Sequence, residues 1–267
     1  MRRINLGRIS AAVAAISLAG GVANRDAIAA MVAAPDPRFY ELKPGEIKLD
    51  LHLIGAFAVL RFQTEPGSPE SIQYRACSFS APTLQRVCSA RAQGDSSSVL
   101  ALTMRDRSGA TQTTFDSLTT DTVIVRQGRY VDGARGTEGD SASRTYRSTR
   151  RYAGVSAAAA YRILDGADSS FASYSYPRRG RYVSNMRTVT YSNVTLPNSR
   201  RGEIVYPTNG VVHATGVSQV SGVESVTQQG LNVITLFDGT RTPEAYIGGQ
   251  RYTLDLATGV ATPKPIN

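Results

Sequence analysis

The end of the chain carries the clearest folding signal, a series of short segments separated by glycine turns. Residues 232–237 are apolar and rich in strand-forming side chains, and they stop at an Asp-Gly pair. After a Gly-Gly pair at 248–249, apolar and polar side chains alternate through residues 250–256. A period of two between Asp-Gly and Gly-Gly pairs is typical of antiparallel hairpins. The end of the chain is therefore predicted to be a β-meander.

Short apolar segments between glycine, proline and serine turns recur along most of the chain. The clearest are residues 47–62, 72–79, 99–104, 121–127 and 182–196. Ten or more short strands with turns every ~8–12 residues predict an all-β fold, either an antiparallel β-sandwich or a β-barrel. A hydrophobic fraction of 41% is enough for a packed core and argues against global disorder.

Three polar or small-residue segments interrupt this pattern. Residues 128–152 are polar and glycine-containing and are predicted to form a long loop, and residues 165–170 a turn. The alanine-rich segment 153–164 is the best internal helix candidate, although it could equally be a strand. We therefore expect at most one short helix after the N-terminal segment.

The N-terminus resembles a targeting segment. Arg2, Arg3 and Arg8 precede an apolar run over residues 9–23, and the first acidic residue is Asp26. A basic start, a short apolar stretch and small residues at the end predict a secretory signal peptide over residues 1–23. The alternatives are an N-terminal amphipathic helix of a cytoplasmic protein, or a basic arm. No later segment is apolar enough to predict a transmembrane helix.

The remaining chain divides by composition. Residues 24–46 are small and proline-punctuated and are predicted to be a linker. Residues 47–262 form the predicted β domain, which could contain two lobes over 47–92 and 99–262. Residues 263–267 follow as a short tail.

The two cysteines, Cys77 and Cys88, lie close together in the sequence. An even cysteine count in an exported protein favours a disulfide, and two buried free thiols are the alternative. A metal site is not expected, because two thiolates are half of a usual zinc shell and only His52 and His213 could complete it. No cofactor is expected.

Few side chains point to catalysis. With two histidines, a nucleophile–histidine site would have to use one of them, and no GxSxG, HExxH or phosphate-binding glycine motif is present. Asp238, Glu244 and Asp255 lie near one another in the predicted meander. If the protein were a secreted hydrolase, two of these carboxylates would have to act as its catalytic pair. We interpret them as turn formers and solvated strand residues, and the protein as non-enzymatic.

The net charge of +9 is concentrated in one region. Residues 126–201 hold 14 arginines and 5 acidic residues, a balance equal to that of the whole chain, and tyrosines are interspersed among the arginines. Arginine can bind phosphate, sulfate or carboxylate through two hydrogen bonds, and tyrosine offers a flat face with a polar tip. The anion-binding candidates in this arginine–tyrosine belt are Arg147, Arg150, Arg151, Tyr152, Tyr176, Arg178, Arg179, Arg181 and Tyr182.

The belt would suit acidic glycans, lipopolysaccharide phosphates, haem propionates or nucleic acid. Nucleic acid is disfavoured if the protein is exported. The alternative is a diffuse positive surface without a specific ligand.

Residues 207–262 also carry a family resemblance. The segments PTNGVVHATGV, LFDGT and AYIGGQRYTLDLATGV resemble the β-barrel halves of transferrin-binding-protein-like surface and secreted proteins of Gram-negative bacteria. The resemblance implies an eight-stranded barrel that binds a host protein or haem. It assigns no individual binding residue.

These observations together predict an exported, non-enzymatic β-protein that acts in binding or assembly. It would be periplasmic, secreted or associated with the outer surface of a bacterium. Its expected partners are an anionic glycan, lipopolysaccharide or another envelope or host protein. One alternative is a viral or phage capsid or tail β-protein with a basic N-terminal arm, and a second is the secreted hydrolase.

Overall fold

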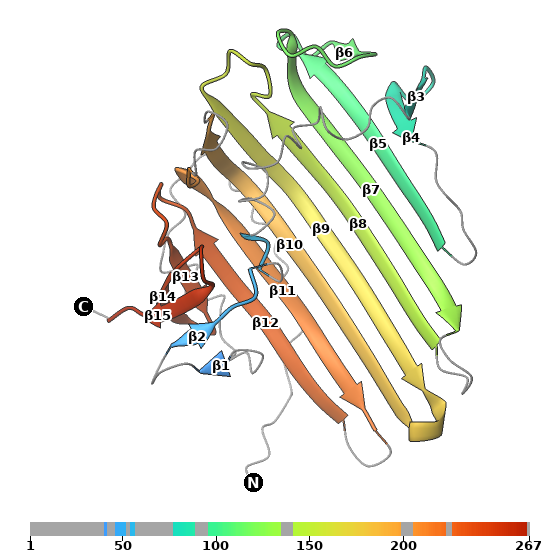
Figure 1. The fold of residues 1–267 in the computed structure, drawn as a ribbon, viewed down its shortest axis with the longest axis vertical. Helices are drawn as coiled ribbons and strands as arrows, with labels where there is room; N and C mark the ends of the chain where they lie inside the picture. Colours follow the sequence, from blue (N-terminus) through green and yellow to red (C-terminus); the bar gives the residue numbers. More distant parts are fainter. Residues whose placement is uncertain are drawn as a thin grey trace.

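The computed structural model describes residues 40–41, 46–51, 54–56, 77–88, 96–134, 141–198, 205–222 and 226–265. The predicted signal peptide and His52 lie outside these residues. The all-β prediction is confirmed, because the described residues form one 15-stranded sheet in which every strand pair is antiparallel (Figure 1). No helix among these residues is long and apolar enough to cross a membrane.

The strands are β1 (Tyr40–Glu41), β2 (Ile47–Lys48), β3 (Cys77–Ser80), β4 (Gln85–Cys88), β5 (Ser96–Asp106), β6 (Thr111–Gln112), β7 (Thr120–Ala134), β8 (Ser141–Ala153), β9 (Tyr161–Tyr176), β10 (Arg181–Pro197), β11 (Asn209–Ser221), β12 (Val226–Leu236), β13 (Glu244–Ile247), β14 (Gln250–Leu254) and β15 (Val260–Pro263). Their order in the sheet is β1-β2-β15-β14-β13-β12-β11-β10-β9-β8-β7-β5-β4-β3, and β6 pairs with β5. β1 lies inside the predicted linker, and β15 reaches the first residue of the predicted tail.

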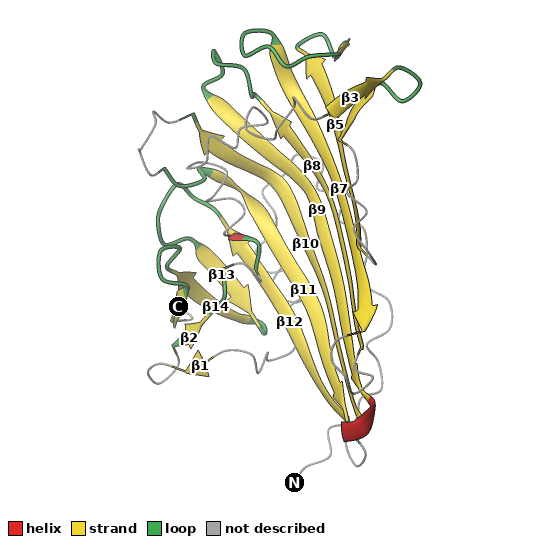
Figure 2. Ribbon diagram, turned by 45° about the vertical axis from the view of Figure 1, so that its right-hand side comes forward, coloured by secondary structure: helices red, strands yellow, loops and turns green. Residues whose placement is uncertain are grey.

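The predicted barrel is corrected to an open sheet. Among the described residues, the sheet ends at β1 on one side and at β3 on the other. β13 pairs with only the last four residues of β12, so the short strands β13–β15, β2 and β1 group at one end of the long strands (Figure 2). Residues 207–262 supply β11–β15 to this sheet, which differs from the eight-stranded barrel that the resemblance implies.

The apolar core lies where the short strands, residues 46–51 and residues 54–56 pack against that end of the long strands. We call the sheet face that carries this core the inner face; Leu102, Val123, Leu164, Val189 and Val212 are buried on it. Gly55 lies against Val189 and Val212, so the segment after β2 crosses β10 and β11 (Figure 1).

The long strands continue well beyond the core. In β10 the residues nearest the β9–β10 turn are exposed or half-buried, and burial begins only at Val189. In β9, Leu164 and Asp168 are the buried residues. We call the part between the core and the β9–β10 turn the distal half; it comprises residues 126–134, 141–149, 168–176, 181–188, 215–221 and 226–231.

Two predicted turns are confirmed. Pro177–Arg179 forms a single 3-10 turn that Gly180 ends in the left-handed region, at φ 55°. Gly248 and Gly249 both have positive φ, 57° and 84°, and join β13 to β14. A two-residue hairpin turn with positive φ at both positions favours glycine, which explains the strength of this sequence signal.

Three predictions in the middle of the chain are wrong. The predicted loop 128–152 contains the last seven residues of β7 and all but the last residue of β8, the predicted turn 165–170 lies inside β9, and the segment 153–164, for which a helix or a strand was expected, is the end of β8, a turn and the start of β9. The strands were not evident because most of the distal half is not buried on either face. Such strands need no apolar alternation, since pairing with neighbouring strands and the strand propensity of Thr, Tyr and Val can hold them.

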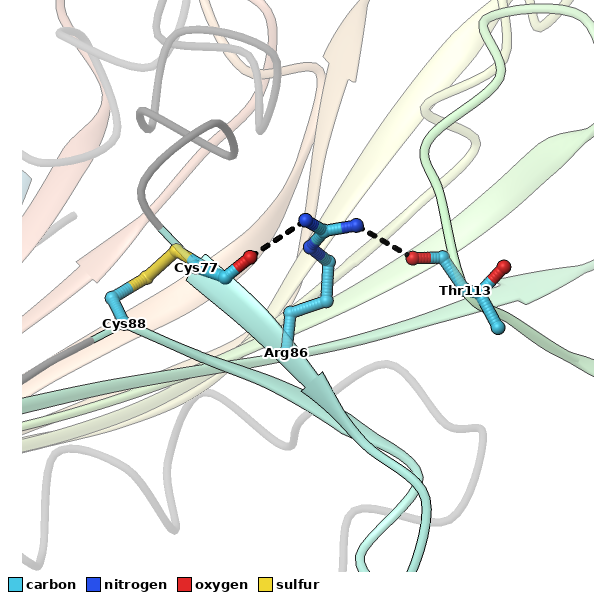
Figure 3. The surroundings of a disulfide bond; sticks show 4 residues. All are labelled: Cys77, Arg86, Cys88 and Thr113. Carbon is cyan, nitrogen blue, oxygen red and sulfur yellow. Dashed lines mark hydrogen bonds between the residues drawn. A yellow bond between two sulfur atoms is a disulfide. The ribbon is translucent and has the colours of Figure 1, made fainter.

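The predicted disulfide is confirmed at the β3–β4 hairpin. Cys77 and Cys88 lie directly opposite each other and are bonded. Beside them, the guanidinium of Arg86 donates hydrogen bonds to the carbonyl oxygens of Cys77 (2.7 Å) and Thr113 (2.9 Å) (Figure 3). Arg86 thereby ties this edge hairpin to the segment that follows β6.

Candidate functional site

Strand alternation divides the predicted arginine–tyrosine belt between the two faces of the sheet. Successive side chains of a strand point to opposite faces, and Tyr152 pairs with the core residues Val123 and Leu164 on the inner face. By this register the inner-facing candidates are Arg150, Tyr152, Tyr176 and Arg181, and the outer-facing candidates are Arg147, Arg151 and Tyr182. Arg178 and Arg179 belong to the β9–β10 turn, and for Arg179 the structure describes the backbone but not the side chain.

The nine candidates therefore do not form one site. Arg150 and Tyr152 lie beside the core, whereas Arg178, Arg179 and Arg181 lie at or beside the far turn. The structure instead gathers other belt residues on the inner face of the distal half. We call them the inner arginine–tyrosine surface; it comprises Arg129, Arg144, Tyr146, Tyr174, Tyr176, Arg181 and Arg187.

The register places these residues in neighbouring positions. Arg129 pairs with Tyr146, Tyr146 with Ser170, and Ser170 with Arg187, which makes one row across β7–β10. One step farther from the core, the guanidinium carbon of Arg144 lies 5.4 Å from the centre of the Tyr174 ring. This distance is within the range of cation–π contacts. Arg129 and Arg144 are both exposed, so their hydrogen-bond donors are open to a ligand.

The inner face of the distal half is far more basic than its outer face. Four arginines, at positions 129, 144, 181 and 187, face inward, and no described inner-facing residue beyond Asp168 is acidic. On the outer face of the same stretch, Arg126 and Arg147 are accompanied by Asp132. The positive field is thus concentrated on one side of the sheet.

A buried polar network separates this surface from the core. Asp168, which is 4% exposed, accepts hydrogen bonds from Ser148 Oγ (2.6 Å), Arg150 Nε (2.9 Å) and Tyr191 Oη (2.8 Å). Arg150 Nη2 donates a second hydrogen bond to the same carboxylate, and the guanidinium lies over the Tyr191 ring at 5.3 Å. The network joins β8, β9 and β10 side by side.

The protonation states of the network follow from its geometry. Burial alone would raise the pKa of Asp168, but the hydrogen bonds and charge of Arg150, with Ser148 and Tyr191, hold it below its ordinary value. Burial raises the pKa of Tyr191 and of Tyr152. At neutral pH the carboxylate is therefore ionised and both phenols are protonated, so the charges of Arg150 and Asp168 cancel. The network connects three strands and contributes no net charge, so the positive charge of the inner face comes from the arginines of the surface beyond it.

On the outer face, Arg151 Nη1 lies 3.7 Å from Asp165 Oδ2; the Arg151 side chain is exposed and that of Asp165 is partly exposed. Arg126 and Arg147 are exposed, and among the described residues no carboxylate is within ion-pair distance of either.

The three carboxylates considered for hydrolysis have other partners. Asp255 accepts two hydrogen bonds from Arg241 (2.8 and 2.7 Å), and Glu244 forms ion pairs with Arg251 and with Lys264 (3.4 Å). Asp238 accepts hydrogen bonds from the backbone N–H (3.0 Å) and hydroxyl (2.7 Å) of Thr240 in the turn after β12.

The pKa values of Asp255 and Glu244 also argue for a bracing role. The hydrogen bonds from Arg241 lower the pKa of Asp255. Burial opposes the shift at Glu244, but its bonds to Arg251 and Tyr246 lower that pKa as well. A general acid needs a raised pKa, which neither group has. These residues brace the meander.

The described residues contain no group of three histidine, cysteine or carboxylate side chains placed to hold a metal ion. His213 is engaged on the outer face, where its Nε2 lies 2.9 Å from Asn232 Oδ1.

Several members of the inner surface belong to the predicted arginine–tyrosine belt but were not among its nine candidate binding residues. Arg129, Arg144, Tyr146 and Tyr174 all lie in or beside segments that the sequence predicted as loop or turn. A spacing of two in Arg144-x-Tyr146 and Arg150-x-Tyr152 was the available signal, and it has meaning only once the segment is known to be a strand.

The chain matches no family model, and neither characterised proteins nor solved structures show significant similarity to it, so the resemblance noted for residues 207–262 stays a prediction.

Proposed function

We propose that this protein is an exported, non-enzymatic binding protein that holds an anionic saccharide on the inner arginine–tyrosine surface. The ligand class is a sugar polymer or glycolipid that carries sulfate, phosphate or carboxylate groups, as acidic glycans and lipopolysaccharide do. The observation that carries the proposal is the concentration of four arginines on the inner face of the distal half, where no described inner-facing residue beyond Asp168 is acidic.

The chemistry of the side chains favours this ligand class. A guanidinium binds a phosphate, sulfate or carboxylate through two parallel hydrogen bonds, and the tyrosine rings beside it offer apolar faces for a sugar ring. Two exposed arginines on adjacent strands, Arg129 and Arg144, can contact successive anionic groups of one chain. An open sheet surface suits a polymer that lies across several strands.

Two further observations support export. The N-terminal pattern of arginines followed by an apolar run is that of a signal peptide. The Cys77–Cys88 disulfide is typical of a protein that folds in an oxidising compartment. We propose a periplasmic, secreted or outer-surface location. N-terminal sequencing of the protein purified from its native cells tests this, and an intact Met1 would refute export and favour the structural-protein alternative.

Binding is tested with immobilised heparin and with lipopolysaccharide, each measured over a series of salt concentrations. The double variant Arg129→Gln/Arg144→Gln removes two inner charges, and we expect about a tenfold loss of affinity per arginine. Its binding should also depend less steeply on salt, because fewer ionic contacts remain.

The matched control is Arg126→Gln/Arg147→Gln. It removes the same charge from the same two strands, β7 and β8, but on the outer face. Retained binding in this control and loss in the inner variant would support the site. Equal losses in both would show that a diffuse field binds the polyanion, and would end the proposal.

A further inference from the structure

Part of β12 has a strand on one side only. β11 pairs with β12 along its whole length, whereas β13 pairs only from Val233 onward. Within the described part of the chain, no strand pairs with the other side of residues 226–231. Figure 1 accordingly shows the distal half of β12 as the last strand of the sheet on that side.

This edge lacks the usual features that prevent an exposed edge strand from pairing with a strand of another molecule. Exposed edge strands commonly carry a lysine, a proline or a bulge, or are very short. β12 is 11 residues long, contains no charged residue or proline, and pairs with β11 without a register shift. The two terminal strands of the sheet, β1 and β3, are only two and four residues long.

Charge favours a second copy of this chain as the partner. The protein carries a net charge of +9, so most of its surface repels a copy of itself. β11 and β12 contain no lysine, arginine, aspartate or glutamate. With strands about 4.8 Å apart, the arginine-bearing β10 strands of two copies joined at β12 would lie about 24 Å from each other. That distance is about three times the screening length of ~8 Å at physiological salt.

The geometry of the edge also suits self-pairing. Two identical strands related by a two-fold axis normal to the sheet run antiparallel, as all neighbouring strands of this sheet do. An axis at Gln229 places Gln228 opposite Gly230 and Thr227 opposite Leu231. In this register residues 227–231 of each copy pair with residues 231–227 of the other, and Val233, where β13 begins to pair, lies outside this stretch. The pairing therefore covers most of the open stretch and ends before the residues of β12 that pair with β13.

We propose that two copies of this protein pair antiparallel along β12, centred on Gln229, and join their sheets into one. The two-fold axis is normal to the sheet, so the inner faces of both copies lie on the same side. The proposal does not depend on the ligand of the inner surface.

A charge-exchange experiment tests it, with the mass measured by sedimentation or light scattering. Gln229 faces its own counterpart across the axis, so Gln229→Lys and Gln229→Glu should each be monomeric, and an equimolar mixture should recover a dimer of one copy of each. The matched control Gln219→Lys places the same charge on β11, one strand from the edge, and should remain dimeric. Oxidised Gln229→Cys should form a covalent dimer, because opposite residues of an antiparallel pair have Cα atoms about 4.5–5.5 Å apart.

Four outcomes would overturn the proposal. The first is a wild-type protein that stays monomeric at about 100 μM, where an interface of micromolar Kd is saturated. The second is a failure of the mixed charge variants to pair while each keeps the wild-type circular dichroism spectrum. The third is assembly beyond two copies, which would indicate head-to-tail pairing of β12 with another edge. The fourth is a Gln229→Lys variant that stays dimeric alone.

Discussion

Replacing Asp168 with asparagine should lower the free energy of unfolding by about 2–4 kcal/mol, although the two side chains have nearly the same shape. Two arginine–aspartate pairs connect β8 to β9, and they lie on opposite faces of the sheet. The Arg150–Asp168 pair is inside, beside the core, and the Arg151–Asp165 pair is outside in solvent. The contrast between them makes the prediction specific.

The magnitude follows from burial and hydrogen bonding. Asp168 accepts four hydrogen bonds from three residues, and its side chain is 5% exposed, against 22% for Arg150. Removing one partner of a fully buried ion pair costs about 3–5 kcal/mol, because the other charge stays buried without compensation. The partial exposure of Arg150 reduces this somewhat. An asparagine amide would also place an N–H₂ group against donors, where a carboxylate oxygen had accepted.

The control is Asp165→Asn. The side chains of Arg151 and Asp165 are 54% and 31% exposed and 3.7 Å apart, and exposed pairs of this kind contribute less than about 1 kcal/mol. Urea unfolding followed by circular dichroism measures both variants against the wild type. Losses of equal size in the two variants would refute the reasoning, since burial would then have no influence on the strength of the pair.

Three further predictions concern stability. The pKa of Asp168 is held below its ordinary value. Its contribution to stability is therefore complete above the unfolded-state pKa of about 3.9 and is lost as the pH falls through the lower folded-state pKa. In urea unfolding at several pH values, the free energy of unfolding should fall less steeply with decreasing pH in Asp168→Asn than in the wild type. Gly55→Ala should lose about 2–3 kcal/mol, because the new Cβ would lie 2.4 Å from Val189 Cγ1 at a φ of +76°; Gly109→Ala, with φ +86° in open space, should lose only about 1 kcal/mol, and thermal unfolding compares the two. The double variant Cys77→Ser/Cys88→Ser should unfold about 3 kcal/mol more easily than the oxidised wild type if the hairpin unfolds together with the sheet, and reducing agent should then affect the wild type alone.

The parts of the fold that could be predicted are those in which one strand face is buried. Tyr252, Leu254 and Leu256 are buried as their alternation indicated, and the turn before them needs two residues with positive φ. β8 could not be predicted in this way, because most of its residues are exposed or half-buried on both faces. Its strand conformation depends on pairing with β7 and β9, which is not visible in a local window of sequence.

The site shows the same limit. The belt of arginine and tyrosine was evident from composition, but its division into two faces depends on register. Arg150 and Arg151 are adjacent in the sequence, yet one is bonded to a buried carboxylate and the other points to solvent. Asp168 was missed because the segment around it was predicted to be a turn.

The pairing of β2 with β15 affects the order in which parts of the protein fold. Most strand neighbours from β7 to β15 are joined by a short hairpin, so these contacts close small loops and can form quickly. Lys48 and Val260, by contrast, pair across more than 200 residues. We expect the β2–β15 ladder to be the slowest contact to form, and a ribosome-bound or partly translocated chain cannot make it until both strands have emerged. A protein built this way completes its core only after nearly the whole polypeptide is available.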